Sequence, residues 1–499
     1  MTTPAPLRSS RWLCALAALS AWPLLAAEPA PGAGQERPSS FKLGAEVWKL
    51  PDGERTGVIG ATQRFAFGER WFVGPAVYGA ASGRRGGLFV IGGEAVWRHP
   101  GPAGSRVEAG LFVGAGGGAA APVGGGLVLR PQIDWSWPLG PGWLGVSAAR
   151  VHFPSGRITS HQLGLVYTVD GRFRHAASGE EPSSGGVRWG LGIDRLWLHV
   201  GRAEGRAGAR YGQGGLRVDR WLRPGLHVSL EAAGAAQGGA DGYAELLAGV
   251  GAEWPLWGTA GGKTPHVGLR GALGLAGGGA VDTGGGPLVK LVGSLHWPLG
   301  RDLALGLEAG RVAAPDGRWR ARLLQVSLGW VLDRPVDAGW DPALASPRSD
   351  TIEWSAAVAQ FPRVRFRDGS DDAVQTLGLR VRRVLDPALG EHLQLAGSVH
   401  FAAGGHAGAY GAGLIGLAWA TPLDRPGWQF GAELLAGAAG GGGVDTRGGA
   451  VLQPMLRAGW ADGAQRWQLG LGQVRALRGG LDGPVIELSY GVAIGVPRQ

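Results

Sequence analysis

The sequence predicts an all-β fold: a transmembrane antiparallel β-barrel of about 24 strands, built from three homologous repeats of about eight strands each. Three observations predict it. Apolar and polar residues alternate with period 2, the alternating runs last about 10–14 residues, and tryptophans gather at the ends of these runs. Strands of soluble proteins are usually shorter, about 5–6 residues, so we favour a membrane barrel over a soluble sandwich.

The N-terminus has the features of an export signal. Two arginines precede the apolar run WLCALAALSAWPLLAA at residues 12–27, which ends in small residues that suit cleavage. We therefore predict a signal peptide over residues 1–27 and a linker over residues 28–40. The sole cysteine, Cys14, lies in the predicted signal, so the mature chain has no thiol for a disulfide or a metal. Export without cysteine indicates a bacterial envelope.

The charge pattern argues against a nucleic-acid partner. Of the 48 basic residues, Arg8 and Arg11 lie in the predicted signal, which leaves 46 against 39 acidic residues. Nearly all of the basic residues are arginines. Acidic and basic residues are interspersed throughout, so no basic patch of the kind that binds nucleic acid stands out. We predict no nucleic-acid partner and no cofactor.

Three copies of one unit follow the signal. GGGLVLRPQIDWSWPLG around Trp137 aligns without a gap with GGGPLVKLVGSLHWPLG around Trp297, and RGGAVLQPMLRAGWADG around Trp460 follows the same frame. The three tryptophans lie 160 and then 163 residues apart. Repeat 1 covers residues 41–172, repeat 2 residues 187–333 and repeat 3 residues 351–496, with linkers over 173–186 and 334–350.

The stretch AGGGAVDTGGG around Asp282 invites two catalytic interpretations, and the repeats argue against both. An aspartic protease needs two Asp-Thr-Gly loops with paired carboxylates, but repeat 1 lacks the aspartate and repeat 3 reads Asp-Thr-Arg at Asp445. A phosphate loop needs a following helix, whereas the alternating segment PLVKLVGSLHWPL follows here. We therefore predict that both aspartates are turn residues in mobile, glycine-rich hairpin loops.

The strands after these loops show how the two faces differ. In repeat 1, Leu129, Ile133 and Trp135 share one face, and Arg130 and Asp134 lie on the other. In a membrane barrel the polar face would line the lumen. The candidate lumen-lining residues are Arg130, Gln132, Asp134, Gln162, Glu231, Glu245, Glu253, Arg270, Lys290 and Gln325. The candidate interfacial aromatic girdle is Trp97, Trp137, Trp143, Trp254, Trp297 and Trp460.

With this architecture over residues 41–496, the chain resembles bacterial outer-membrane β-barrel proteins, without resembling one specific family. Such proteins tend to end in a strand reading polar-x-Gly-x-x-apolar-x-aromatic, which their insertion machinery recognises. The last strand here reads SYGVAIGV, residues 489–496, and departs from the pattern by ending in Val496 followed by PRQ. The resemblance implies a location in the cell outer membrane, contact with outer-membrane lipid, and insertion by the barrel-insertion machinery.

The sequence leaves open one large barrel or three tandem eight-stranded barrels. The linkers between repeats are longer than the turns within them, which favours three barrels. The polar faces, however, contain many small residues, among them Gly249, Gly251, Gly268, Ala272 and Gly274. Because the interior of an eight-stranded barrel must be filled by side chains, these small residues lead us to favour the single barrel.

The leading functional hypothesis is an outer-membrane pore or export conduit that a periplasmic or lipoprotein partner plugs or gates. The alternative is a non-conducting structural or surface-attachment protein of the envelope. A lipid hydrolase is a third hypothesis, in which His152 with Ser155, or Ser160 with His161, would pair for nucleophilic catalysis. Neither pair recurs in the other repeats, so we predict no catalytic residue and no enzyme.

Overall fold

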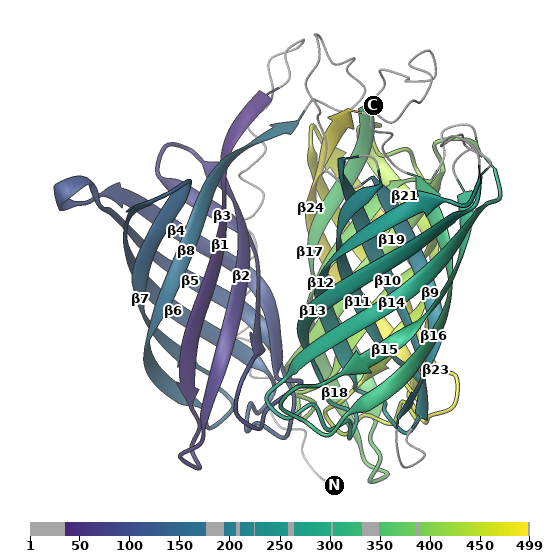
Figure 1. The fold of residues 1–499 in the computed structure, drawn as a ribbon, viewed down its shortest axis with the longest axis horizontal. Helices are drawn as coiled ribbons and strands as arrows, with labels where there is room; N and C mark the ends of the chain where they lie inside the picture. The colour runs from purple at the N-terminus through teal and green to yellow at the C-terminus, as the bar shows by residue number, and fades with distance from the viewer. Residues whose placement is uncertain are drawn as a thin grey trace, which may run out of the picture.

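The computed structural model describes residues 35–175, 194–205, 210–223, 225–257, 264–300, 303–331, 349–385 and 389–497. Within these ranges the chain forms 24 β-strands and one 3-10 turn, η3 (Pro102–Gly104). The strands close into three separate barrels, each with an antiparallel up-and-down order (Figure 1). The predicted signal peptide and most of the predicted linkers lie outside the described residues.

The strands divide evenly among the barrels. Barrel 1 comprises β1 (Gln35–Lys49), β2 (Arg55–Phe67), β3 (Trp71–Ala80), β4 (Phe89–Pro100), β5 (Arg106–Gly117), β6 (Leu127–Leu139), β7 (Gly142–His152) and β8 (Thr159–His175). Barrel 2 comprises β9 (Arg195–Gly205), β10 (Arg210–Arg223), β11 (Leu226–Gly238), β12 (Ala244–Pro255), β13 (His266–Gly277), β14 (Pro287–Pro298), β15 (Leu303–Ala313) and β16 (Arg320–Val331). Barrel 3 comprises β17 (Ser349–Arg365), β18 (Asp371–Val384), β19 (Leu393–Gly404), β20 (Gly411–Ala420), β21 (Gly427–Gly440), β22 (Ala450–Asp462), β23 (Gln465–Ala476) and β24 (Asp482–Pro497).

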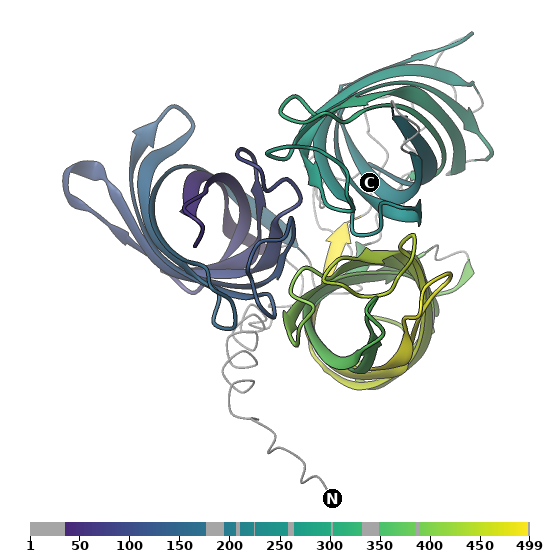
Figure 2. The same cartoon turned by 90° about the horizontal axis from the view of Figure 1, so that it is seen from below.

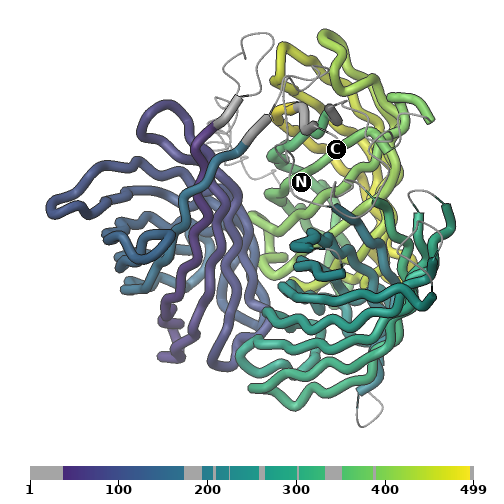
Figure 3. Tube along the Cα trace, turned by 45° about the horizontal axis from the view of Figure 1, so that its top comes forward, coloured from purple at the N-terminus to yellow at the C-terminus, as the bar shows by residue number. Residues whose placement is uncertain are grey.

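Each barrel closes because its first strand pairs with its last. β1 pairs with β8, β9 with β16 and β17 with β24, all antiparallel. Figure 3 traces the three closed walls along the chain. The predicted all-β class, with eight strands to a repeat, is confirmed. Our preference for one large barrel is wrong, and the alternative of three tandem barrels is confirmed.

The small interior residues that favoured one large barrel have a different role: they make room for long side chains on neighbouring strands. A Cβ on Gly251 would lie 2.5 Å from the His227 ring, and one on Gly268 would lie 2.5 Å from Ser294 Oγ. The interior is therefore filled, as an eight-stranded barrel requires. The small residues of one strand do not reveal that the interior is filled, because the large side chains come from the strands beside it.

The barrels are apolar outside, and their interiors bury charged residues together with an apolar cluster nearer the end with the longer loops. Leu163 on β8, Leu273 on β13 and Leu456 on β22 are 78%, 69% and 68% exposed, whereas Lys290 and Glu487 are 1% and 0% exposed. A soluble protein would have the opposite arrangement. Strand pairing also satisfies the backbone hydrogen bonds, which hydrocarbon demands. No helix among the described residues is long and apolar enough to span a bilayer.

The two ends of each barrel differ in the length of their connections. In barrel 1, residues 68–70, 101–105 and 140–141 form short turns at one end, whereas residues 81–88 and 118–126 form longer loops at the other. We call these the turn end and the loop end. Outer-membrane barrels have short periplasmic turns and longer external loops. We therefore assign the loop end to the outer face of the membrane.

The three barrels contact one another through their loops at the loop end, where barrel 1 meets the other two (Figure 1). The loop between the third and fourth strands of each barrel packs on the loop between the fifth and sixth strands of the next. Gly86 of barrel 1 donates its amide to Gly284 O of barrel 2 at 2.8 Å. Asp241 of barrel 2 accepts from Thr446 Oγ1 of barrel 3 at 3.2 Å and pairs with Arg367.

The contact between barrels 3 and 1 completes the ring, which Figure 2 shows end-on. A Cβ on Gly408 of barrel 3 would lie 1.9 Å from Gly124 O of barrel 1. Each barrel thus uses two different surfaces, and the head-to-tail contacts close after three units. The glycine-rich stretches are therefore packed between barrels, and our expectation of mobile hairpin tips is wrong.

One glycine in each stretch occupies an equivalent place in this ring. A Cβ on Gly126 would lie 2.1 Å from Ala402 O, one on Gly286 2.3 Å from Ala80 O, and one on Gly449 2.1 Å from Ala235 O. Each carbonyl belongs to the neighbouring barrel, and all three glycines have a positive φ, +93°, +116° and +94°. Only glycine permits both this backbone conformation and this approach.

We predict that barrel 2 folds alone. Residues 187–333, expressed behind a signal peptide, should insert, resist protease and migrate faster on gels before heating, because β9 and β16 pair with each other. A control fragment that ends before β16 leaves two unpaired strand edges in lipid, so it should be degraded. Equal protease sensitivity of the two fragments would contradict independent closure.

We predict that replacing Gly126, Gly286 and Gly449 together by alanine separates the loops, because three Cβ atoms would collide with neighbouring carbonyls. Limited trypsin digestion should cleave the loops of this variant faster than those of the wild type. The control replaces Gly140 and Gly463, which also have positive φ but no atom within 4 Å of a Cβ. The control measures only the cost of placing alanine in a left-handed backbone conformation, about 1–2 kcal/mol per residue. If the control variant is cleaved as fast as the triple variant, the three glycines are not required for the contacts between barrels.

Candidate functional site: the charged barrel interiors

The ten candidate lumen-lining residues all lie buried inside barrels, but in two separate interiors. Arg130, Gln132, Asp134 and Gln162 lie in barrel 1, and Glu231, Glu245, Glu253, Arg270, Lys290 and Gln325 lie in barrel 2. They therefore do not share one lumen. The candidates include no residue of barrel 3. The polar faces of the strands in repeat 3 could have indicated equivalent residues there.

In barrel 1 the interior charges are paired across the lumen. Lys42 Nζ on β1 lies 2.9 Å from Glu94 Oε1 on β4 and 3.2 Å from Asp134 Oδ2 on β6. Arg130 on β6 donates to both carboxylate oxygens of Glu46 on β1, at 3.0 and 2.5 Å. β1 and β6 are not neighbours in the sheet. These side chains therefore span the interior rather than line its wall.

Barrel 2 has a second network of the same kind. Lys290 Nζ on β14 lies 2.7 Å from Glu231 Oε1 on β11 and 2.5 Å from Glu245 Oε1 on β12. Arg270 Nη2 on β13 lies 2.7 Å from the other oxygen of Glu231. Because buried charges are costly unless they are paired and hydrogen-bonded, the packing of one strand depends on charges that other strands contribute.

Barrel 3 has the most compact network. Arg380 donates to Glu433 at 2.8 and 2.6 Å. Arg457 bridges Glu433 and Glu487 at 2.8 Å each, and His400 Nε2 lies 3.3 Å from Glu487. The three-dimensional pairing of these five residues, which lie on β18, β19, β21, β22 and β24, could not be read from the sequence.

Little free volume remains between these side chains. A cavity inside barrel 1, beside Lys42 and Arg130, measures about 10 Å³, and so does a cavity inside barrel 2 beside Arg217 and Glu253. Each has room for about one water molecule. An ion that crossed barrel 1 or barrel 2 would have to separate existing ion pairs and pass an apolar cluster nearer the loop end, which includes Phe112 in barrel 1 and Leu288 in barrel 2.

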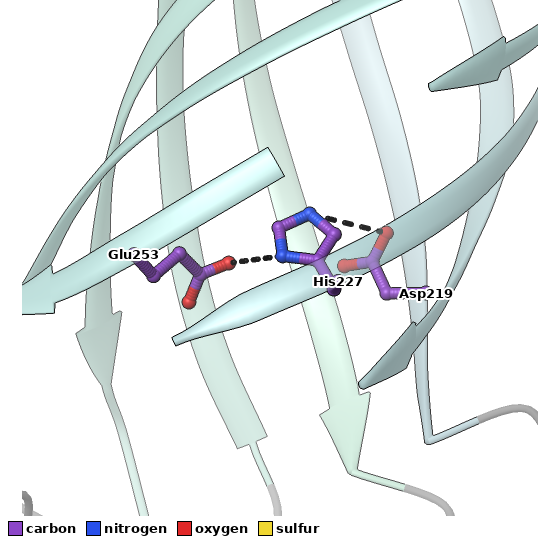
Figure 4. Close-up of side chains that lie close together, drawn as sticks. All are labelled: Asp219, His227 and Glu253. Atoms are coloured by element: carbon purple, nitrogen blue, oxygen red, sulfur yellow. Dashed lines mark ion pairs between the residues drawn. The ribbon is translucent and has the colours of Figure 1, made fainter. Parts of the chain in front are cut away.

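One cluster in barrel 2 has side chains of the type that bind metals (Figure 4). Asp219, His227 and Glu253 offer ligand atoms within 4.8 Å of one another. His227 Nδ1 is 3.7 Å from Glu253 and Nε2 is 4.0 Å from Asp219. Arg217 Nε already lies 3.0 Å from Asp219, however, and Arg195 pairs with both carboxylates. Two guanidiniums balance the two carboxylates, so we assign the cluster to the ion-pair network.

The pairs considered for a hydrolase do not form dyads. His152 Nδ1 lies 3.0 Å from Thr159 Oγ1, and Ser155 Oγ instead accepts a backbone amide at 2.8 Å. Ser160 is buried inside the barrel and His161 is exposed outside, because adjacent residues of a strand point to opposite faces. Neither serine therefore has the histidine partner that nucleophilic catalysis needs.

Asp282 and Asp445 serve the loop structure, as expected of turn residues. Asp282 accepts the Gly284 amide at 3.3 Å and Arg318 Nε at 2.7 Å, and the hydrogen bond from Arg318 lowers the pKa of Asp282. Asp445 accepts the Gly480 amide at 3.0 Å. Asp282 thus stabilises its own hairpin and joins it to the loop between β15 and β16, and Asp445 joins its hairpin to the loop between β23 and β24.

The six candidate girdle tryptophans all lie near the turn end of their strands. Trp137, Trp254, Trp297 and Trp460 are exposed on the outer surface, and Trp97 is half-buried. Trp143 is not a girdle residue, because it points into the mouth of barrel 1, where its indole donates to Asp170 Oδ2 at 3.0 Å and stacks on Arg106. Other exposed tryptophans, Trp71, Trp419, Trp428 and Trp467, lie at the same end. The aromatic residues therefore mark one membrane interface, the periplasmic one in our assignment.

The fold and its inside-out polarity define the class of the protein. Closed, even-stranded, antiparallel barrels with an apolar exterior, a polar interior and an aromatic belt are transmembrane β-barrels of the bacterial outer-membrane type. The chain has this architecture, and its apolar outer surface suits a lipid bilayer.

Comparisons with known proteins add no narrower assignment. No protein-family model matches the chain, and no curated protein does. Among solved structures, it is similar to Pseudomonas aeruginosa OpdO, at 11% identity over 92% of this chain and 97% of that chain, with a TM-score of 0.22. The outer membrane protein OpdK of P. aeruginosa is 10% identical over 92% and 98%, with a TM-score of 0.23. Acinetobacter baumannii OccAB3 is 10% identical over 92% and 99%, with a TM-score of 0.21. TM-scores this low carry no argument about function.

We predict that Arg457→Ala destabilises barrel 3 by about 3–5 kcal/mol, because it leaves Glu433 and Glu487 short of a buried partner. Urea unfolding, followed by the loss of heat-modifiable migration, should show a lower midpoint. Arg363→Ala is the control: Arg363 is 71% exposed, and its ion pair with Asp371 should contribute about 0–1 kcal/mol. Equal shifts for both variants would mean that the interior network does not stabilise the barrel.

Proposed function

We propose that this protein is a non-conducting structural or surface-attachment protein of the outer membrane. The observation that supports this best is the filling of the interiors by ion pairs that cross from one wall to another, with cavities of about 10 Å³ between them. The wide lumen that a single barrel of about 24 strands would enclose does not form, since the described strands close into three barrels. The ring of loops then holds three filled barrels together and presents one continuous platform at the outer face.

A pore remains the second candidate, and one observation favours it. Each interior contains buried charged residues, such as Lys290, Glu245 and Arg270 in barrel 2, although an apolar cluster packs the part nearer the loop end. Conduction through such an interior would require the ion pairs to separate. A gating partner in the periplasm or a lipoprotein is part of this second hypothesis, as is delivery of the chain by the barrel-insertion machinery, and both stay predictions.

Conductance in planar bilayers separates the two candidates. We expect the wild-type protein to give no large current steps, because each barrel is filled. The variant with Lys290→Ala and Glu245→Ala removes one cross-lumen pair without changing the net charge, and it should give small steps through barrel 2. Large steps from the wild type would instead support the pore. The position of the protein in the bilayer is checked on the same sample by heat-modifiable migration, so silence is not mistaken for a failure to insert.

A further inference from the structure

The loop end of barrel 1 has a row of basic side chains on its outer surface, in place of the aromatic belt of the turn end. Arg55 on β2 lies opposite Lys49 on β1, and Arg150 on β7 lies opposite His161 on β8. The Lys49 amide donates to Ser160 Oγ on β8 at 2.9 Å, so β1 and β8 stay adjacent at this level. We call these four residues the basic row.

All four side chains of the basic row are exposed. Within the described part of the chain, no ion pair joins any of them to a carboxylate, and the row therefore has three formal positive charges without a local counter-charge. Like charges directly opposite on neighbouring strands are destabilising. An anion bound across the row would remove this repulsion.

An apolar groove lies directly beside the row, on the same four strands. Its volume is about 490 Å³, and its lining includes Ala45, Val47, Ile59, Val146, Leu163 and Leu165. Val47 lies two residues from Lys49 and Leu163 two residues from His161, so the groove runs from the row toward the membrane centre. The small residues Ala45, Gly57 and Gly164 contribute to its lining and leave it hollow.

Basic groups at the level of the headgroups, above a groove that faces hydrocarbon, match a lipid with an anionic head. The row crosses three strand spacings, about 14 Å in all, which is wider than one phosphate group. We propose that this face of barrel 1 binds a phosphorylated lipid of the outer leaflet with more than one phosphate, such as lipid A. Its phosphates contact Lys49, Arg55 and Arg150, and one acyl chain occupies the groove. The proposal rests on the outer-membrane location of the proposed function.

The equivalent positions differ in the other two barrels. In barrel 2, Arg210, Arg322 and Arg311 stand at the positions of Arg55, His161 and Arg150, and Glu204, which pairs with Arg202 at 2.9 Å, stands at that of Lys49. In barrel 3 the positions that correspond to Arg150 and His161 are Gln473 and Pro484, which are paired in the same way. We place the binding face on barrel 1, because there the row adjoins the apolar groove.

The test is binding of lipid A to the purified, detergent-solubilised full chain, counted by native mass spectrometry. We expect the wild type to retain lipid A in preference to phosphatidylcholine, which has no net charge. The double variant Lys49→Ala/Arg55→Ala should bind lipid A about thirtyfold more weakly, since each basic residue near an anionic lipid surface raises the affinity by about five- to sixfold. Ala45→Phe fills the groove without changing charge and should also weaken binding.

Arg70→Ala is the matched control, because Arg70 is exposed at the turn end of barrel 1 and should leave lipid A binding unchanged. Unchanged binding by the double variant, or equal binding of phosphatidylcholine, would overturn the proposal. So would inorganic phosphate that displaces lipid A while Ala45→Phe binds normally, since the site would then recognise free phosphate. Heat-modifiable migration shows that each variant is folded. A failure here leaves the conductance result, and hence the proposed function, unaffected.

Discussion

The structure depends on the closure of each eight-stranded sheet on itself. In hydrocarbon, an open strand edge leaves backbone groups unpaired at a cost of several kcal/mol each, and pairing β1 with β8, β9 with β16 and β17 with β24 removes every such edge among the described strands. Eight strands enclose a space that side chains must fill. The diameter set by closure therefore dictates what the inward-facing residues have to be.

The interiors meet that demand with two kinds of side chain: apolar clusters nearer the loop end and networks of charged residues over the rest. Arginine, lysine and glutamate side chains reach across the lumen, and glycines such as Gly251 and Gly268 leave room for His227 and Ser294 on neighbouring strands. Charges pair across strands, as Arg457 does with Glu433 and Glu487, whereas the buried Arg466 donates to backbone carbonyls. The same charged side chains therefore occupy the lumen and neutralise one another. Because they leave no wide passage, we favour a structural role over a wide pore.

Closure also removes any need for the three barrels to pair with one another through their strands, so their association rests on the loops. Equivalent glycines, Gly126, Gly286 and Gly449, let the backbone of one barrel approach the next closely enough to complete a ring of three. Because each barrel offers two different surfaces, the ring needs three units in a fixed order. One continuous chain ensures that stoichiometry.

The sequence by itself determined the β-class, the three repeats, the strand length and the inward or outward direction of most side chains, because period-2 alternation is a local property that residues such as Arg130 and Trp137 reveal directly. It did not determine whether the repeats close separately, since the same alternation suits one large barrel or three small ones. Only the tertiary structure decided that, through the pairing of strands about 130 residues apart, such as β1 with β8. It likewise decided which charges meet inside, why the Asp282 loop is rich in glycine, and that Lys49 and Arg150 share one face, because each depends on neighbours that are distant in sequence.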